Sequence, residues 1–246
     1  MKKNVYNDIP DISQDILKTN LKKITDHINK EVDKIYGSEK IVNEEIKLTY
    51  KINEHGFRTH SMENIQNPCW LALGCSNTFG MGNPEELRWS NLLEKKYDTK
   101  IYNLGAPGGG TDTVFRLALG WIDIIKPEKI LVLWPPIWRK DLIFEDDNKK
   151  AVRSFQGKVV LQDSGNYFLR TYFLHDENSI INFEKNSLAL QQLCNERNIE
   201  LVTLHAPVIG SKIRHSENDT VFARDGKHLG KDYQQEVADS FCKEIE

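Results

Sequence analysis

From residue 69 onward, short runs of apolar residues alternate with longer stretches in which apolar residues recur every three or four positions. Short continuous runs are typical of strands buried on both faces, and the longer spacing is typical of amphipathic helices. The predicted strands are 69–73, 100–104, 129–134 and 199–204, and the predicted helices are 85–97, 111–125, 179–198 and 231–245. Right-handed crossovers between parallel strands place helices on both faces of a sheet. The pattern therefore predicts an α/β fold, a three-layer α/β/α sandwich around a parallel, doubly wound sheet.

The first 66 residues follow a different pattern. Apolar residues recur at helical spacing over 12–36, and polar and apolar residues alternate over 46–59 around a turn at 53–56. The first pattern predicts a helix, and the second predicts a hairpin or a strand with a turn. We expect an N-terminal helix and hairpin extension, 1–66, packed on a main domain of 67–246. A dimer contact or a docking arm is the alternative role for the helix.

Composition excludes several classes of protein. The chain has 246 residues, with 33 basic and 36 acidic side chains and a net charge of -3, so no basic excess indicates a nucleic-acid partner. It has no apolar run long enough to span a membrane, and no apolar stretch follows the two N-terminal lysines as in a secretory signal. We expect a cytoplasmic location. Four cysteines without a CxxC pair, and histidines without metal-ligand spacing, predict neither a disulfide scaffold nor a metal or other cofactor.

The loops that follow the predicted strands contain the candidate chemistry. Ser76 follows the first strand, a glycine-rich loop that starts at Gly105 follows the second, and Asp225 and His228 precede the last helix. Loops after the carboxyl ends of parallel strands meet at one edge of the sheet. A serine needs a base to become a nucleophile, usually a histidine that a carboxylate orients, and it needs N–H groups to hold the oxyanion. These loops contain each of those groups.

Each motif also has a simpler interpretation. Ser76 can be a helix N-cap, and Asp225 with His228 can form a capping turn. The glycine-rich loop can be a phosphate cradle, although it matches neither the P-loop nor the dinucleotide-binding pattern. Only the combination of all three motifs, in order on separate loops, favours catalysis.

The combination resembles the SGNH (GDSL-type) hydrolases over about residues 67–246. The segment 72–78, Ala-Leu-Gly-Cys-Ser-Asn-Thr, resembles the first block of that family, which contains the nucleophile. The segment 103–105 resembles the second block, whose glycine donates to the oxyanion, and 225–228 matches the Asp-x-x-His of the last block. The resemblance implies a flavodoxin-like fold and a serine esterase or deacylase with a Ser76–His228–Asp225 triad. The backbone N–H groups of Ser76 and Gly105 would form the oxyanion hole.

Two positions depart from the family pattern. Cys75 stands where the family has an aspartate before the serine, but that aspartate is not a triad member. The third block of the family supplies an asparagine as an oxyanion donor, whereas the matching loop here, 134–139, has none. Asn77 and Arg139 are the candidates to replace it. For Arg139 the alternative is an ion pair with a carboxylate such as Asp141.

Trp138 and His205 are the candidates for substrate binding. Trp138 lies beside two prolines and could stack on a sugar ring, together with Trp134, for which core packing is equally plausible. His205 follows the strand 199–204, and a purely structural histidine is the alternative there. We expect the substrate to be a small-molecule or glycan ester with a short acyl group, such as an O-acetyl group on a carbohydrate. The alternatives are acyl transfer to a sugar hydroxyl, and a weakly active or non-catalytic glycan-binding or assembly protein on the same fold. The sequence does not define the oligomeric state.

Overall fold

The computed structural model describes residues 50–146, 149–156, 176–206 and 228–246, and it describes side chains for these residues except 142–156. The helix expected over 12–36 lies outside the described residues, and so does the segment 158–162, Lys-Val-Val-Leu-Gln, whose apolar residues indicate a strand.

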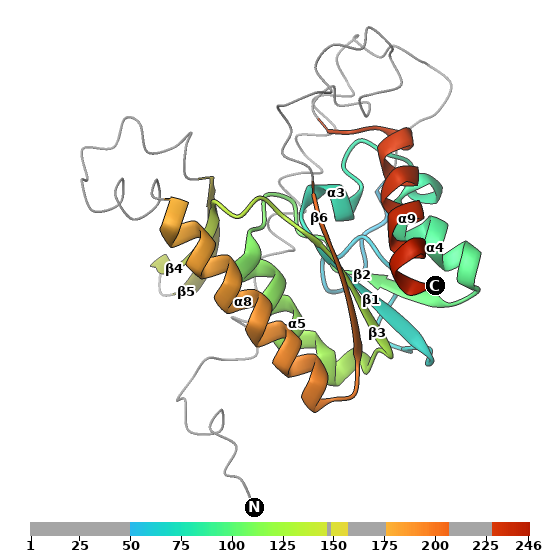
Figure 1. The fold of residues 1–246 in the computed structure, drawn as a ribbon, viewed down its shortest axis with the longest axis horizontal. Coiled ribbons are helices and arrows are strands. Elements are labelled where there is room, and N and C mark those ends of the chain that lie inside the picture. Colours follow the sequence, from blue (N-terminus) through green and yellow to red (C-terminus); the bar gives the residue numbers. More distant parts are fainter. Residues whose placement is uncertain (1–49, 147–148, 157–175, 207–227) are drawn as a thin grey trace, which may run out of the picture.

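The centre of the fold is a parallel sheet with the strand order β2-β1-β3-β6 (Figure 1). Its strands are β1 (Cys69–Gly74), β2 (Lys100–Asn103), β3 (Lys129–Trp134) and β6 (Glu200–His205). The chain moves outward from β1 to β2, then crosses to β3 and β6 on the other side. The carboxyl ends of β1, β2 and β3 therefore lie next to one another at one edge of the sheet.

Helices cover both faces of this sheet (Figure 1). The helices α4 (Trp89–Tyr97) and α9 (Lys231–Ile245) pack on one face, where Trp89 stacks on Phe241 at 4.7 Å between ring centroids. On the other face lie α5 (Thr111–Ile125) and α8 (Asp176–Glu196). These layers confirm the predicted three-layer α/β fold. The apolar stripes of the helices are the faces that they bury against the sheet.

Several predicted boundaries differ from those observed. The prediction of one helix over 85–97 is wrong at Arg88, which has an extended backbone and separates the short 3-10 helix η2 (Glu85–Leu87) from α4. Residues 139–156, for which the apolar pattern predicts no strand or helix, include an antiparallel hairpin of β4 (Arg139–Asp146) and β5 (Lys149–Gln156).

The strand predicted within 46–59 is wrong for residues 50–59, whose backbone contains turns and bends but no strand. The predicted turn is present, because Gly56 N–H donates to Asn53 O at 3.0 Å. The Asn53 carboxamide explains the missing strand. Its Oδ1 accepts from the N–H groups of His55 and Phe57, at 3.1 and 2.9 Å, and an Asx-type turn of this kind replaces strand pairing.

Candidate active site

Ser76 lies at the carboxyl edge of the sheet, as the first residue of the short helix α3 (Ser76–Phe79). The chain reaches this helix directly from β1 through Gly74 and Cys75. The N-cap residue is Cys75, whose carbonyl accepts from Phe79 N–H at 2.9 Å, so Ser76 does not have the N-cap role considered above. Ser76 is 6% exposed. The first N–H groups of a helix have no acceptor within that helix, so those of Ser76 and Asn77 are suited to bind an oxyanion.

Gly105, in the loop after β2, packs directly against α3. A Cβ atom at this position would lie 2.3 Å from Phe79 N and 2.7 Å from Thr78 C. The Gly105 N–H group donates to Asn103 Oδ1 at 2.9 Å. An oxyanion at Gly105 would therefore share this N–H group with Asn103 or displace it.

Asn103, the last residue of β2, links several parts of this edge. Its Nδ2 donates to Thr78 O at 2.7 Å and to Ser90 Oγ at 2.8 Å, and its backbone N–H donates to Thr59 Oγ1 at 2.8 Å. Together with the bond from Gly105, these contacts join the loops after β1 and β2. The relative position of α3 and Gly105 is therefore set by one buried carboxamide.

The start of α9 is attached to the same region by two buried hydrogen bonds. Gln234 Nε2 donates to Asn77 O at 3.1 Å, and Asn83 Nδ2 donates to Leu229 O at 3.1 Å. Tyr233 of α9 is buried, and this burial, with a smaller effect of Cys75, raises the pKa of its phenol above the usual value. His228 directly precedes Leu229 and is half-buried. The structure thus brings the His228 segment to the α3 loop.

Asp225 lies outside the described residues, so the carboxylate of the predicted triad is not placed. His205 ends β6 and is exposed, and its ring lies 5.2 Å from that of Phe183 on α8, measured between centroids.

The loop between β3 and β4 contains the remaining predicted site residues. Trp134 is buried and meets Phe183 edge-on at 5.4 Å, so it belongs to the core. Trp138 and Arg139 are half-buried. Arg139 Nη1 donates to Gly109 O at 3.4 Å, whereas Asp141 forms its ion pair with Arg116, at 3.4 Å. Arg139 therefore contacts the glycine-rich loop.

Four residues that the sequence did not single out as functional hold this edge together. Asn103 gave a signal, as a polar residue at the end of a buried strand. The other three, Asn83, Gln234 and Arg58, gave no signal in the sequence. Each donates hydrogen bonds to backbone carbonyls far away in the chain, and for Arg58 one of these is Gly80 O, at 2.8 Å from Nη1.

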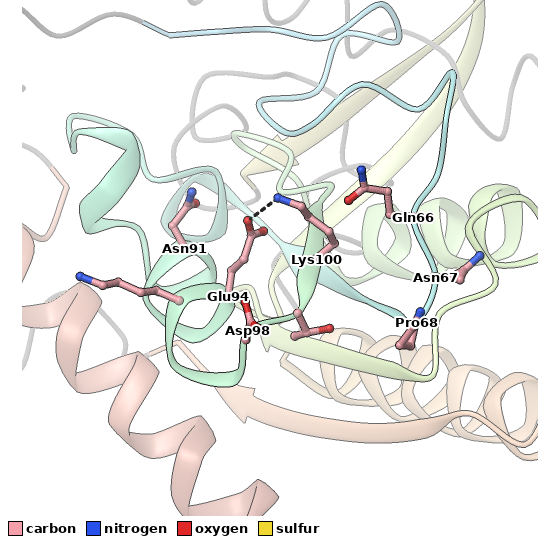
Figure 2. Close-up of a pocket in the computed structure, with 9 residues that line it drawn as sticks. Gln66, Asn67, Pro68, Asn91, Glu94, Asp98 and Lys100 are labelled. Carbon is pink, nitrogen blue, oxygen red and sulfur yellow. Dashed lines mark hydrogen bonds and ion pairs between the residues drawn. The ribbon is translucent and has the colours of Figure 1, made fainter.

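The opposite edge of the sheet has a polar pocket, which Figure 2 shows. It lies at the start of β1 and β2, where Asn67, Pro68 and Lys100 line it with Glu94 of α4. Glu94 pairs there with Lys100 at 3.3 Å. This pocket is therefore remote from the carboxyl edge.

Among the residues that the structure describes, no group of three acidic, histidine or cysteine side chains could hold a metal ion.

No protein-family model and no curated protein matches this sequence. The solved structures that are similar to the chain include TesA, with a TM-score of 0.49 and 11% identity, over 72% of this chain and 98% of that chain. They also include the psychrotrophic esterase EstA from Pseudoalteromonas sp., with a TM-score of 0.45 and 15% identity, over 73% of this chain and 97% of that chain. A third is the acetyl xylan esterase AlAXEase, with a TM-score of 0.39 and 14% identity, over 71% of this chain and 73% of that chain. Because all three TM-scores lie below 0.5, the fold class stated above rests on the strand order and on the helices that cover the sheet.

No helix within the described ranges has both the length and the apolar character needed to cross a membrane.

Proposed function

We propose that the protein is a serine ester hydrolase in which Ser76 is the nucleophile, His228 the general base and Asp225 the carboxylate that orients the imidazole. The observation that carries the proposal is the pair of hydrogen bonds from Asn83 to Leu229 and from Gln234 to Asn77. These bonds join the segments that contain Ser76 and His228, although the two residues lie near opposite ends of the domain in the amino-acid sequence. The resemblance of the same residues to the SGNH blocks supports this reading.

The reaction would proceed through an acyl-enzyme. His228 accepts the proton of Ser76 Oγ while Oγ bonds to the acyl carbon, and the carbonyl oxygen becomes the oxyanion. The N–H groups of Ser76 and Gly105 hold that oxyanion, and Asn77 or Arg139 supplies the further donor. The intermediate then expels the alcohol, which takes the proton from His228. Water attacks the acyl-enzyme with the same histidine as base, and this step releases the acid and restores Ser76.

We further propose a short acyl ester as the substrate, such as an acetyl group on a carbohydrate. Trp138 and Arg139 are both half-buried, and Arg139 contacts the glycine-rich loop. A ring face and a guanidinium next to each other in the chain suit a polar, hydroxyl-rich molecule.

The test is hydrolysis of p-nitrophenyl acetate together with labelling by a fluorophosphonate probe. Ser76→Ala and His228→Ala should each lower kcat by more than about 1000-fold, because triad members act as a unit. Ser76→Ala should also abolish labelling. Ser179→Ala is the matched control, since Ser179 is likewise a buried serine but lies on α8. If the triad variants hydrolyse and label like the control, the proposed function is wrong. Labelling of Ser76 without ester turnover would favour a weakly active binding protein or an acyltransferase.

A further inference from the structure

The segment that precedes β1 makes buried hydrogen bonds with the loop that follows Ser76. Arg58 belongs to this segment and is 1% exposed. Its Nη1 donates to Gly80 O at 2.8 Å and to Phe79 O at 3.3 Å, and its Nη2 donates to Asn83 O at 3.0 Å. One guanidinium therefore binds three carbonyls across a five-residue loop, 79–83. Hydrogen bonds from a charged donor are stronger than neutral ones, so this contact fixes the shape of the loop.

Tyr50 contacts the same loop. Its hydroxyl accepts from Gly82 N–H at 2.8 Å, and its ring meets Phe79 edge-on at 5.3 Å between centroids. The Arg58 guanidinium lies 4.3 Å from the centre of the Tyr50 ring, within the range of a cation–π contact. The segment 50–58 thus supplies both a charged and an aromatic contact to the loop after α3.

Asn83, at the end of this loop, connects the loop to the His228 segment by a hydrogen bond. Asn83 is 2% exposed, and its Nδ2 donates to Met81 O and to Leu229 O, both at 3.1 Å. The second of these bonds reaches the residue that follows His228. A continuous series of buried contacts therefore runs from Arg58 through the loop to Leu229, the residue that follows the proposed base.

We propose that Arg58 and Asn83 are positioning residues that set the placement of His228 relative to Ser76. This inference rests on the proposed function. It adds a role for the segment before β1, whose described residues contribute no helix or strand to the three layers. The physical reason is geometric. Nucleophile and base come from distant parts of the chain, and an error of about 1 Å in such a pair can cost about 100-fold in rate.

The test compares Asn83→Ala with Asn186→Ala. The two asparagines are comparable, because Asn186 is 3% exposed and its Nδ2 also makes two hydrogen bonds, to Thr111 Oγ1 at 3.0 Å and to Asp112 Oδ1 at 2.8 Å. Each variant removes two hydrogen bonds, but only Asn83 contacts the His228 segment. Asn182 Nδ2 still donates to both acceptors of Asn186, at 3.4 and 3.0 Å, so the control variant keeps its acceptors satisfied. We expect Asn83→Ala to lower kcat for p-nitrophenyl acetate by about 10- to 100-fold with KM within about twofold, and Asn186→Ala to leave kcat within about twofold.

Two further measurements keep the inference testable if Asn83→Ala does not fold. Arg58→Lys keeps the charge but loses the planar fork that spans the three carbonyls, and it should lower kcat by about 3- to 30-fold with KM unchanged. Hydrogen exchange of the peptide 228–234 should be faster in Arg58→Lys than in wild type and unchanged in Asn186→Ala.

The outcomes separate this inference from the proposed function. Wild-type protein that neither hydrolyses esters nor labels at Ser76 overturns both. Active wild-type protein overturns the positioning role alone if Asn83→Ala loses no more kcat than Asn186→Ala, or if Arg58→Lys keeps full kcat and native exchange at 228–234.

Discussion

At the scale of single residues, Gly105 shows how closely the loops of the carboxyl edge approach one another. The atoms that a Cβ would meet belong to the backbone of α3, so no side-chain rotation could make room for it. Gly108, three residues later, has the opposite situation. Its φ of +76° is in the left-handed region, but a Cβ there would meet nothing within 4 Å.

These two glycines predict different costs for alanine. Gly105→Ala should lower the free energy of unfolding by about 3 kcal/mol, near the upper end of the range for overpacking, because α3 must move. Gly108→Ala should cost about 1 kcal/mol, from the backbone conformation alone. Urea unfolding followed by tryptophan fluorescence measures both. Equal costs would show that the loop after β2 can move away from α3.

At the scale of elements, α4 is connected to the segment before β1 and to the start of β2 through one carboxylate. Glu94 accepts from His60 Nε2 at 2.8 Å and from Ile101 N–H at 3.0 Å, and it pairs with Lys100 in the pocket of Figure 2. Burial raises the pKa of Glu94, but the hydrogen bonds from His60 and Ile101 and the nearby positive charge outweigh this effect. The pKa of Glu94 therefore lies below its usual value of 4.5.

The lowered pKa predicts the pH dependence of a Glu94→Gln variant. A carboxyl group whose pKa is lower in the folded state contributes stability that is present above about pH 4.5 and is lost as the pH falls through the folded value. The variant should be less stable than wild type by on the order of 1 kcal/mol at pH 7, and the difference should shrink below pH 4.5. Denaturant unfolding at several pH values tests this. A difference that stays constant down to pH 3 would contradict it.

The elements also show how far the sequence alone could predict the fold. The helices α5 and α9 and the strand β3 match their predicted boundaries, because each has a strong apolar period and a clear end signal. The break at Arg88 was not predictable, since it depends on a hydrogen bond from Arg88 Nη1 to Arg58 O, thirty residues away in the chain. The hairpin of β4 and β5 was missed because its strands are rich in charged residues and lack a clear alternation.

The candidate site, like the fold, could be predicted from the sequence only in part. The positions of Ser76, Gly105 and His228 at the carboxyl edge follow from the order of strands and helices, which the apolar pattern indicates. The contacts of Arg58, Asn83 and Gln234 with that edge were beyond prediction from sequence, because their partners are backbone carbonyls. Every residue has a backbone carbonyl, so a hydrogen bond to a carbonyl leaves no pattern in the amino-acid sequence.

At the scale of the whole molecule, we propose the division into an extension, 1–66, and a main domain, 67–246. The described part of the extension makes buried contacts with the domain. Phe57 meets Trp121 of α5 edge-on at 5.4 Å, and Gln66 N–H donates to Tyr102 OH at 2.9 Å. All four cysteines are buried, with Cys69 and Cys194 in the apolar cluster on the α5 and α8 face of the sheet and Cys242 in the cluster on the opposite face.

The buried thiols predict how the native protein reacts with thiol reagents. Burial raises the pKa of Cys69 and of Cys194 to about 11, so little of either thiol is ionised at pH 8. The native protein should therefore react with Ellman's reagent at least about 100-fold more slowly than the urea-unfolded chain. Mass spectrometry can resolve the individual sites. Similar rates at Cys194 and at Cys242, which lie in opposite layers, would indicate that the two layers open together, whereas fast reaction of native Cys194 would contradict its burial.

The contacts of Asn103 also constrain how this chain can diverge during evolution. Its partners Thr78 and Gly105 offer backbone atoms and tolerate changes of side chain as far as these bonds are concerned, but Thr59 and Ser90 offer hydroxyl groups. Replacement of Asn103 alone would remove the donor to Ser90 Oγ and Thr78 O and the acceptor of Gly105 N–H, whereas the bond between the Asn103 backbone N–H and Thr59 Oγ1 would remain. Descendants of this sequence should therefore retain Ser90 and Asn103 together or replace them together, because a protein in which only one of the two has changed would be less stable.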